Sequence, residues 1–271
     1  MNDTPPPIPP SNVSSSAADQ SAAWNDETLA ADPHARDDKP ERVRSMFGAI
    51  ASAYDLNNRL HSFGLDQRWR KAVVKACAVR PDDRVLDVAC GTGDLTEAFA
   101  RARPTEVVGV DFTPGMLDIA RRKINRRTPR EGQPVPTYHE GDATDLQFSD
   151  ERFTIVSIAF GIRNVGEPAR ALSEFRRVLA PGGRLAVLEF AEPTNPMVRF
   201  GHDLWTRRIM PHTASLIAGD RSGAYHYLPK SVETFLDPAA LVAAIRAAGF
   251  AEPVLRRLTF GTCVAYVAEV S

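Results

Sequence analysis

The stretch that decides the fold is Val85-Leu86-Asp87-Val88-Ala89-Cys90-Gly91-Thr92-Gly93-Asp94-Leu95-Thr96. An apolar strand here runs into a turn with two glycines, and a helix begins directly after it. Glycine at positions 91 and 93 lacks the Cβ atom that would block a close approach, and it permits a positive φ in the tight turn. The helix presents free backbone N–H groups to whatever lies there. The pattern predicts a turn that touches a nucleotide-like ligand.

The residues around the two glycines indicate which ligand fits. A dinucleotide-binding turn needs a third small residue five positions after the first glycine, where helix and strand pack closely, and Thr96 occupies that position. Asp87 and Asp94 add negative charge, which disfavours phosphates and favours a cationic ligand. The turn resembles the glycine-rich loop of class I S-adenosylmethionine methyltransferases, whose cofactor carries a sulfonium and an ammonium group. A plain strand-to-helix turn is the alternative.

Two more acids follow strand ends. Asp111 closes a short apolar strand and lies 18 residues after Gly93, near the roughly 20-residue offset at which a carboxylate reaches ribose hydroxyls. Asp142 is expected to bond an adenine amino group, and Ala143 to leave space for the ring. Helix capping by Asp111 and an Asx turn at Asp142 are the alternatives. The predicted cofactor site combines these residues with Asp87, Gly91 and Gly93 of the turn.

The alternation of elements predicts the architecture. Strands are expected near residues 84–89, 106–110, 135–140, 153–159 and 184–190, with helices between them, and such alternation produces a parallel sheet. Two further strands, 251–258 and 260–269, are joined by a turn too short for a parallel crossover, so they are antiparallel neighbours. The predicted fold class is α/β, a Rossmann-like class I S-adenosylmethionine methyltransferase fold with a mostly parallel seven-stranded sheet and one antiparallel strand.

The N-terminal segment differs in composition from the rest of the chain. Residues 1–40 begin with a proline cluster and continue with Ser, Ala and Asp, with almost no large apolar side chains. Such a segment cannot bury enough surface to offset its ordering entropy. We expect a disordered tail over residues 1–40 and a methyltransferase domain over residues 41–271, for which a chain that is 43% hydrophobic is adequate.

Charge and cysteine content exclude several classes of protein. A formal net charge of −1 gives no whole-chain case for nucleic-acid binding, and the basic run 121–130 is typical of the solvated face of a helix. The three cysteines have no C-x-x-C spacing, so neither a disulfide framework nor a metal site is expected, and a cytoplasmic location follows. No apolar run reaches the roughly 20 residues that span a bilayer. The oligomeric state, a homo-oligomer included, is left open.

Three stretches, residues 54–69, 160–165 and 177–190, together resemble one family, and the similarity extends from about residue 41 to 268. The family is that of the ubiquinone/menaquinone biosynthesis C-methyltransferases. The resemblance implies S-adenosylmethionine-dependent C-methylation of a prenylated hydroquinone, with 2-demethylmenaquinol as the favoured substrate. It implies cofactor contacts from Thr92, Asp111, Asp142 and Ala143, and substrate contacts from Tyr54, Asn58 and Tyr225. Departures from the family pattern, most of them near the entrance region, occur at Asn57, at Asp66 or Gln67, at Ala159, at Ala180 and at Ala191.

The chemistry of this reaction singles out two residues. A hydroquinone attacks through a ring carbon as a neighbouring hydroxyl loses its proton, so a cation near the developing oxyanion helps. Arg163, predicted at the carboxyl end of the fourth strand, would stabilise that oxyanion or orient a water that acts as base. Asn164 would add a directional hydrogen bond. A structural ion pair with Glu189 is the alternative for Arg163.

The segment 197–210 mixes aromatic, aliphatic and basic residues. This composition suits peripheral contact with the inner face of a membrane, and an ordinary lid helix packed on the core would look similar. Two other functions stay open. One is methylation of a ubiquinone precursor or another phenolic small molecule, and the other is a non-catalytic, cofactor-binding assembly protein.

Overall fold

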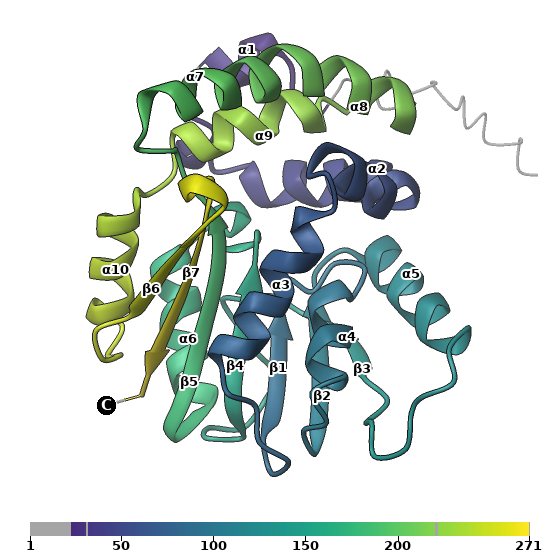
Figure 1. The fold of residues 1–271 in the computed structure, drawn as a ribbon, viewed down its shortest axis with the longest axis vertical. Coiled ribbons are helices and arrows are strands. Elements are labelled where there is room, and N and C mark those ends of the chain that lie inside the picture. Colours follow the sequence, from purple (N-terminus) through teal and green to yellow (C-terminus); the bar gives the residue numbers. More distant parts are fainter. Residues whose placement is uncertain (1–22, 31, 220–221, 271) are drawn as a thin grey trace, which may run out of the picture.

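A seven-stranded sheet forms the centre of the molecule in the computed structural model, which describes residues 23–30, 32–219 and 222–270 (Figure 1). The strands are β1 (Arg84–Val88), β2 (Glu106–Asp111), β3 (Thr137–Glu140), β4 (Phe153–Ala159), β5 (Leu179–Phe190), β6 (Val254–Leu258) and β7 (Cys263–Glu269). Their order is β3-β2-β1-β4-β5-β7-β6. Only β7 runs against its neighbours, pairing antiparallel with both β5 and β6, and the other pairs are parallel. The predicted fold class is confirmed.

Helices cover both faces of the sheet, which is why its central strands are apolar on both sides. One face packs against α3 (Leu65–Ala76) and α4 (Asp94–Ala100), and α5 (Pro114–Asn125) lies beside β2 and β3. The other face packs against α6 (Pro168–Val178) and α10 (Pro238–Ala247). Neighbouring residues of β1 alternate accordingly: Val85 faces the first layer and Leu86 the second, and both are fully buried.

The fifth strand begins earlier than the sequence predicts. Leu179 already pairs with Phe153 of β4, and the register then shifts before Arg184 pairs with Ile155. The irregularity accommodates the Pro181-Gly182-Gly183 turn, in which Gly182 has a φ of +70°. The predicted start at residue 184 therefore corresponds to the regular part of the strand.

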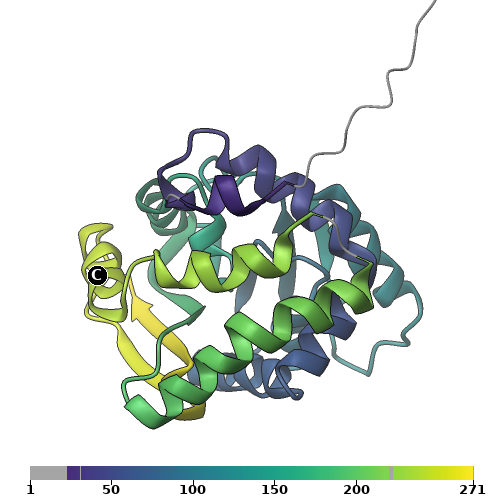
Figure 2. The same ribbon diagram turned by 90° about the horizontal axis from the view of Figure 1, so that it is seen from above.

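A helical cap closes the carboxyl ends of the parallel strands (Figures 1 and 2). It consists of α1 (Asp26–Ala30), the short 3-10 turn η1 (Pro33–Ala35), α2 (Lys39–His61), α7 (Pro196–Asp203), the π-helical segment η3 (Leu204–Ile209), α8 (Met210–Ala218) and α9 (Ala224–Glu233). The 3-10 turns η2 (Ile162–Asn164) and η4 (Thr259–Gly261) follow β4 and β6 beneath it. None of the described helices combines the length and the apolar character needed to cross a membrane.

The structure differs from the predicted domain boundary at residue 41, because residues 23–30 and 32–40 are part of the cap. Trp24 is only 1% exposed and stacks on Tyr227 of α9, with ring centroids 4.5 Å apart. Lys39 is equally buried, and its Nζ donates to the carbonyl of Val165. A composition averaged over forty residues hides the one large aromatic side chain that anchors the segment. Residues 1–22 and 31 of the predicted tail lie outside the described residues.

Candidate active site

The glycine turn is built as the sequence predicts, and its two glycines have different tasks. Gly91 has a φ of +55°, and a Cβ added to it would enter open space. Gly93 has a φ of +83° and directly precedes α4, and a Cβ there would collide with the Tyr138 side chain. Gly91 therefore keeps the backbone open toward a ligand, while Gly93 allows the turn to pack against β3.

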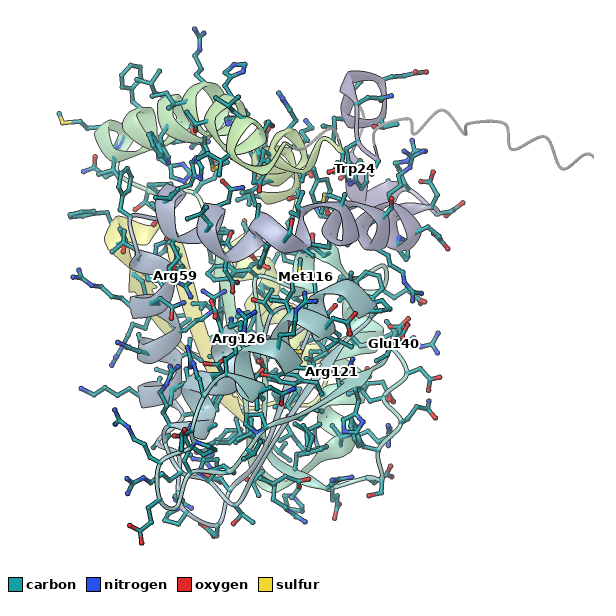
Figure 3. The ribbon with its side chains drawn as sticks, turned by 90° about the vertical axis from the view of Figure 1, so that its right-hand side faces the viewer. Trp24, Arg59, Met116, Arg121, Arg126 and Glu140 are labelled. Atoms are coloured by element: carbon teal, nitrogen blue, oxygen red, sulfur yellow. The ribbon has the colours of Figure 1, made fainter. Side chains whose placement is uncertain are left out.

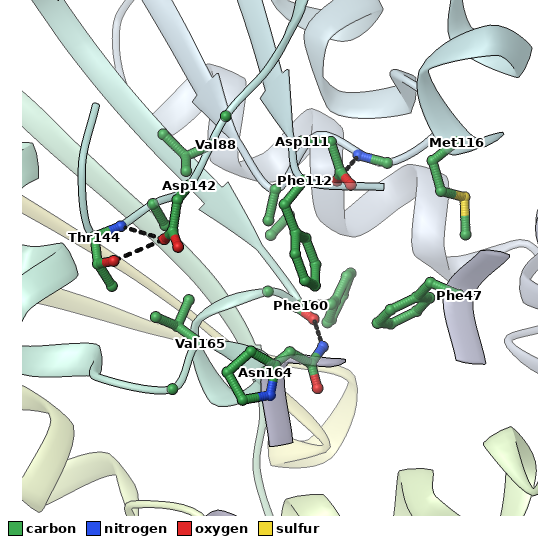
Figure 4. A pocket seen from close by; sticks show the side chains of 18 of the residues that line it. Phe47, Val88, Asp111, Phe112, Met116, Asp142, Thr144, Phe160, Asn164 and Val165 are labelled. Carbon is green, nitrogen blue, oxygen red and sulfur yellow. Dashed lines mark hydrogen bonds between the residues drawn. The ribbon is translucent and has the colours of Figure 1, made fainter. Parts of the chain in front are cut away.

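Four of the predicted cofactor residues, Gly91, Asp111, Asp142 and Ala143, border one cavity at the carboxyl ends of β1, β2 and β4 (Figure 4). The cavity and its open mouth hold about 950 Å³ of empty space. Phe112 and Met116 contribute apolar walls, and α2 closes the cavity through Phe47 and Tyr54. Its ionisable acids are Asp111, Asp142 and Glu167, and no Lys or Arg among the described residues lines it. This lining suits a cationic ligand and disfavours a pyrophosphate.

Asp111 ties the glycine turn to the end of β2. Its carboxylate accepts hydrogen bonds from the backbone N–H of Gly91, at 2.8 Å, and of Thr113, at 2.9 Å. Burial raises the pKa of this carboxyl, and the two N–H donors oppose that shift. The capping alternative is thus part of the geometry, because the Thr113 amide precedes α5. Since Asp111 also borders the cavity, capping does not exclude the ribose contact.

Asp142 likewise combines two features. Its Oδ1 accepts from the backbone N–H of Thr144, at 2.7 Å, and from the Thr144 hydroxyl, at 2.8 Å, which is an Asx turn (Figure 4). The same side chain borders the cavity. The turn fixes the orientation of the carboxylate, so its second oxygen has a defined position at the edge of the cavity.

Asp87 and Thr92 do not border the cavity in this structure, and both side chains bond other parts of the protein. Asp87 lies beneath the turn, where its carboxylate accepts from the hydroxyls of Thr96, at 2.6 Å, and Ser157, at 2.8 Å. Burial raises the pKa of Asp87 to about 6. Thr92 donates its hydroxyl hydrogen bond to Asp55 of α2, at 2.5 Å. Both side chains hold the turn in place.

A network of charges that the sequence did not predict fastens the cap to the glycine turn. Lys123 binds Asp94, at 2.6 Å, and Asp55, at 2.9 Å, and Arg59 of α2 binds the other oxygen of Asp94. Burial would raise the pKa of Asp94, but Lys123 and the nearby arginines hold it at about 2. Most of the basic run 121–130 is exposed as predicted, and Lys123 is the exception. Its partners come from distant segments, so no local signal reveals them.

A second, larger cavity lies between the sheet and the cap, with about 1920 Å³ of empty space including its open mouth. The predicted substrate residues Tyr54, Asn58 and Tyr225 all border it. Its walls are mostly aliphatic and aromatic side chains from α2, α3, α7, η3 and α9. Phe47, Tyr54 and Phe160 line both cavities, so the two spaces meet at these three residues. Burial raises the pKa of the Tyr54 phenol, which keeps it protonated.

Arg163 is buried on η2 and borders the second cavity. Its Nη1 donates to Glu189, at 2.7 Å, and to the carbonyl of Phe160, at 2.8 Å. Its Nε donates to the Ser231 hydroxyl, at 3.3 Å. Burial raises the pKa of Glu189, and the Arg163 charge opposes that shift. The structural ion pair considered above is therefore present. Within the described part of the chain, no hydrogen bond is formed by Nη2.

Asn164, the next residue, borders the first cavity. Its amide nitrogen donates to the carbonyl of Phe160, at 3.2 Å, and its oxygen accepts from the Tyr227 hydroxyl, at 2.9 Å. One short turn thus presents Arg163 to the second cavity and Asn164 to the first. Among the described residues, no group of three or more His, Cys, Asp or Glu side chains is arranged to hold a metal ion.

Solved structures of S-adenosylmethionine-dependent methyltransferases share this fold. One from Thermotoga maritima aligns with a TM-score of 0.58 over 84% of this chain and 100% of its own, at 18% identity. One from Aquifex aeolicus aligns with a TM-score of 0.57 over 82% of this chain and 98% of its own, at 16% identity. The molecule has the fold of that class of enzymes.

Within this class, the chain belongs to the ubiE/COQ5 methyltransferase family, whose model matches residues 35–269. Similar relatives include the demethylmenaquinone methyltransferases of Thermus thermophilus, 46% identical over 83% of this chain and 99% of the relative, and of Clavibacter sepedonicus, 43% identical over 82% and 88%. A ubiquinone/menaquinone biosynthesis C-methyltransferase of Geobacter sulfurreducens is 41% identical over 86% and 90%. The predictions of this family and of an S-adenosylmethionine-dependent methyltransferase are confirmed.

Proposed function

We propose that this enzyme transfers the methyl group of S-adenosylmethionine to a ring carbon of a prenylated hydroquinone, with 2-demethylmenaquinol as the preferred acceptor. The observation that carries the proposal is the meeting of two unlike cavities at Phe47, Tyr54 and Phe160. One is acidic and bordered by a glycine turn, and the other is large and mostly apolar. A cationic methyl donor and an apolar acceptor would therefore face one another where the cavities join.

The first cavity fits the methyl donor. S-adenosylmethionine supplies a methyl group on a positively charged sulfur. The Asp111 carboxylate would accept hydrogen bonds from the ribose hydroxyls, and the Asp142 carboxylate would accept one from the adenine amino group. Ala143 would leave room for the adenine ring. The fit is supported by the open space at Gly91 and by the absence of Lys or Arg from the described lining. Asp87 and Thr92 would act indirectly, by fixing the turn.

The side chains of η2 would act on the acceptor during the reaction. Arg163 borders the second cavity, and its Nη2 donates to none of the described residues, because the hydrogen bonds to Glu189, Phe160 and Ser231 use Nε and Nη1. The Nη2 donors would stabilise the oxyanion that develops as the quinol loses its proton, or orient the water that removes it. Asn164 would assist at the junction. The ion pair with Glu189 does not compete with this role, since it fixes the guanidinium in place.

The apolar tail of the bound acceptor would extend outward through the mouth of the second cavity. Phe63 and Met197 border this cavity and are 73% and 84% exposed. Phe200 of α7 is 74% exposed. Because a polyprenyl chain resides in the bilayer, we include in the proposal that the enzyme works in peripheral contact with the inner face of the membrane.

A methyl-transfer assay with the purified full-length chain tests the proposal. Radiolabelled S-adenosylmethionine is supplied with a reduced 2-demethylmenaquinol that carries a short prenyl tail, and the product is identified by mass. The competing acceptor is a demethylated ubiquinone precursor, which the name of the Geobacter relative supports. We expect the higher kcat/KM for demethylmenaquinol. A higher value for the ubiquinone precursor would reassign the acceptor, and cofactor binding without any transfer would favour an assembly protein.

A further inference from the structure

An N-terminal strap, defined as residues 23–30 and 32–34, packs against α9 ahead of the segment that the family model matches. Figure 3 shows Trp24 of this strap inside the cap. The proposed chemistry assigns no role to the strap. Two of its residues, Trp24 and His34, nevertheless make specific contacts with α9, and we call them its anchors.

Trp24 is the first anchor. Its ring stacks on Tyr227 at an interplanar angle of 22°, and its backbone N–H donates to the carbonyl of Ser222 at 2.9 Å. Gly223, which precedes α9, has a φ of +81°, and a Cβ there would collide with the backbone carbonyl of Trp24. Arg42 closes the other side, since it donates to the carbonyl of Ala23 at 2.7 Å and lies over the indole ring. The strap is thus fixed to both α2 and α9.

His34 is the second anchor. Its Nε2–H donates to the backbone carbonyl of Ser231 at 2.9 Å, one helical turn further along α9 than Tyr227. Its ring also contacts Phe235, with centroids 5.5 Å apart. Because the bond is made to a backbone atom, it fixes the axial position of α9 whatever the neighbouring side chains do.

Two residues of α9 that the strap contacts, Tyr227 and Ser231, also bind the candidate catalytic turn. The Tyr227 hydroxyl donates to Asn164 at 2.9 Å. The Ser231 hydroxyl accepts from Nε of Arg163 at 3.3 Å. Ser231 is fully buried and Tyr227 is 1% exposed, so water does not substitute readily for either contact. Each anchor therefore contacts a residue of α9 that in turn forms a hydrogen bond with a proposed catalytic side chain.

We propose that Trp24 and His34 are positioning residues that hold α9 so that Tyr227 and Ser231 orient Asn164 and Arg163. This inference rests on the proposed function of η2. A displacement of about 1 Å at a reacting group can reduce the rate about 100-fold, so a small shift of α9 is sufficient. None of the strap residues lines the first cavity. Loss of the strap contact therefore lowers kcat while S-adenosylmethionine binding persists.

The variants that test this are Trp24→Ala, Trp24→Phe, which retains a ring to stack on Tyr227, and Glu27→Gln as a control at an exposed strap position. Measured below each variant's melting temperature, kcat for demethylmenaquinol falls at least about 10-fold in Trp24→Ala, within the range expected for misplacement. The Kd for S-adenosylmethionine changes less than twofold, roughly the scatter expected of an unaffected site. Trp24→Phe recovers most of the rate, and Glu27→Gln equals wild type.

A double-mutant cycle separates positioning from general destabilisation. Tyr227→Phe removes the hydrogen bond to Asn164 and keeps the ring under Trp24. If the strap acts through that bond, Trp24→Ala lowers kcat less in the Tyr227→Phe background than in wild type, because coupled residues are not additive. Additive effects on kcat, or an unchanged kcat in Trp24→Ala, would overturn the inference.

Amide hydrogen exchange tests the positioning role without any acceptor, because it reports on the order of α9 and η2 directly. Trp24→Ala should speed amide exchange in α9 and in residues 162–165, and leave the glycine turn unchanged. Unchanged exchange in both segments would contradict the positioning role even if no acceptor were methylated. A wild-type protein that methylates neither quinol would instead overturn the proposed function alone.

Discussion

Three aspartates in or beneath the proposed cofactor site show how one residue type takes different roles at neighbouring strand ends. Asp111 borders the cavity between two backbone N–H donors, Asp142 lies at its edge in an Asx turn, and Asp87 is sealed beneath the turn. The sequence predicts the ends of these strands correctly, and the cofactor contacts of the acids stay a prediction. The partner hydroxyl of Ser157, seventy residues from Asp87, has no local signal.

Asp111 provides the first test at this scale. Asp111→Ala removes a buried carboxylate that would bind the ribose hydroxyls, and hydrogen bonds to charged groups are each worth about 1.5–3 kcal/mol. The Kd for S-adenosylmethionine, measured by calorimetry, should rise on the order of 10- to 100-fold. Asp118→Ala on the exposed face of α5 serves as the control. An unchanged Kd for Asp111→Ala would show that this residue only holds the glycine turn against the end of β2.

Asp87 should make stability depend on pH in an unusual direction. Its pKa is about 6 in the folded protein against an ordinary value of 3.8. Between these pH values the folded state holds a proton that the unfolded state has released. The free energy of unfolding therefore decreases as the pH rises from about 4 to about 6, by about 3 kcal/mol for this group.

Asp87→Asn abolishes this contribution, because the amide cannot ionise and the hydroxyls of Thr96 and Ser157 can rotate to suit it. Urea unfolding at pH 4.5 and 7.5 measures the effect for wild type and variant. The wild type should lose more stability than the variant between the two conditions. Equal losses would show that Asp87 titrates at its ordinary pKa.

At the scale of elements, local patterning predicted the strands but missed the strap. Each strand is a short apolar run that closes on a turn, and such runs are visible in a window of a few residues. The sequence of residues 23–40 is polar on average, and the placement of residues 23–30 and 32–40 depends on single long-range contacts, above all that of Trp24 with Tyr227. The turn η2 shows the same limit, because Arg163 was singled out by its strand end while its contact with Ser231 was not foreseen.

The glycine turn supplies a prediction for one element. Alanine at a positive φ costs about 1–2 kcal/mol, and Gly132→Ala measures this cost alone, since its φ is +70° and its Cβ would meet open space. Gly93→Ala should destabilise the protein more, because of the collision with Tyr138. Gly91→Ala should match Gly132→Ala in stability but weaken cofactor binding. Chemical denaturation and calorimetry separate the two effects, and equal stability of Gly93→Ala and Gly132→Ala would disprove the collision.

At the scale of the molecule, the sheet carries the proposed cofactor site and the cap carries most of the proposed acceptor site. Helix α2 borders both cavities through Phe47 and Tyr54, and charged contacts fasten it to the glycine turn. The sheet followed from sequence because its strands alternate with helices along the chain. The cap joins an N-terminal helix to helices some 150 residues later, so its assembly depends on contacts that no local pattern encodes.

The placement of the cap predicts how the enzyme would reach a membrane-borne acceptor. Met197 borders the second cavity, Phe200 lies three residues further along α7, and both side chains are largely exposed. Inserting one such side chain into the bilayer interface contributes up to about 1.5–3 kcal/mol. Replacing both by serine should therefore reduce co-sedimentation with anionic phospholipid vesicles by at least about 10-fold.

The length of the acceptor's tail decides whether this surface serves catalysis. Met197→Ser/Phe200→Ser should raise KM for a long-tailed demethylmenaquinol in vesicles, because that substrate is reached only from the bilayer. The same variant should keep its kcat and the KM for a short-tailed quinol in solution, because that substrate is reached without contact with the bilayer. Val135→Ser, an exposed apolar residue beside β3, is the control and should change neither value. Equal KM changes for both tails would place the effect inside the cavity and exclude α7 as the surface that contacts the membrane.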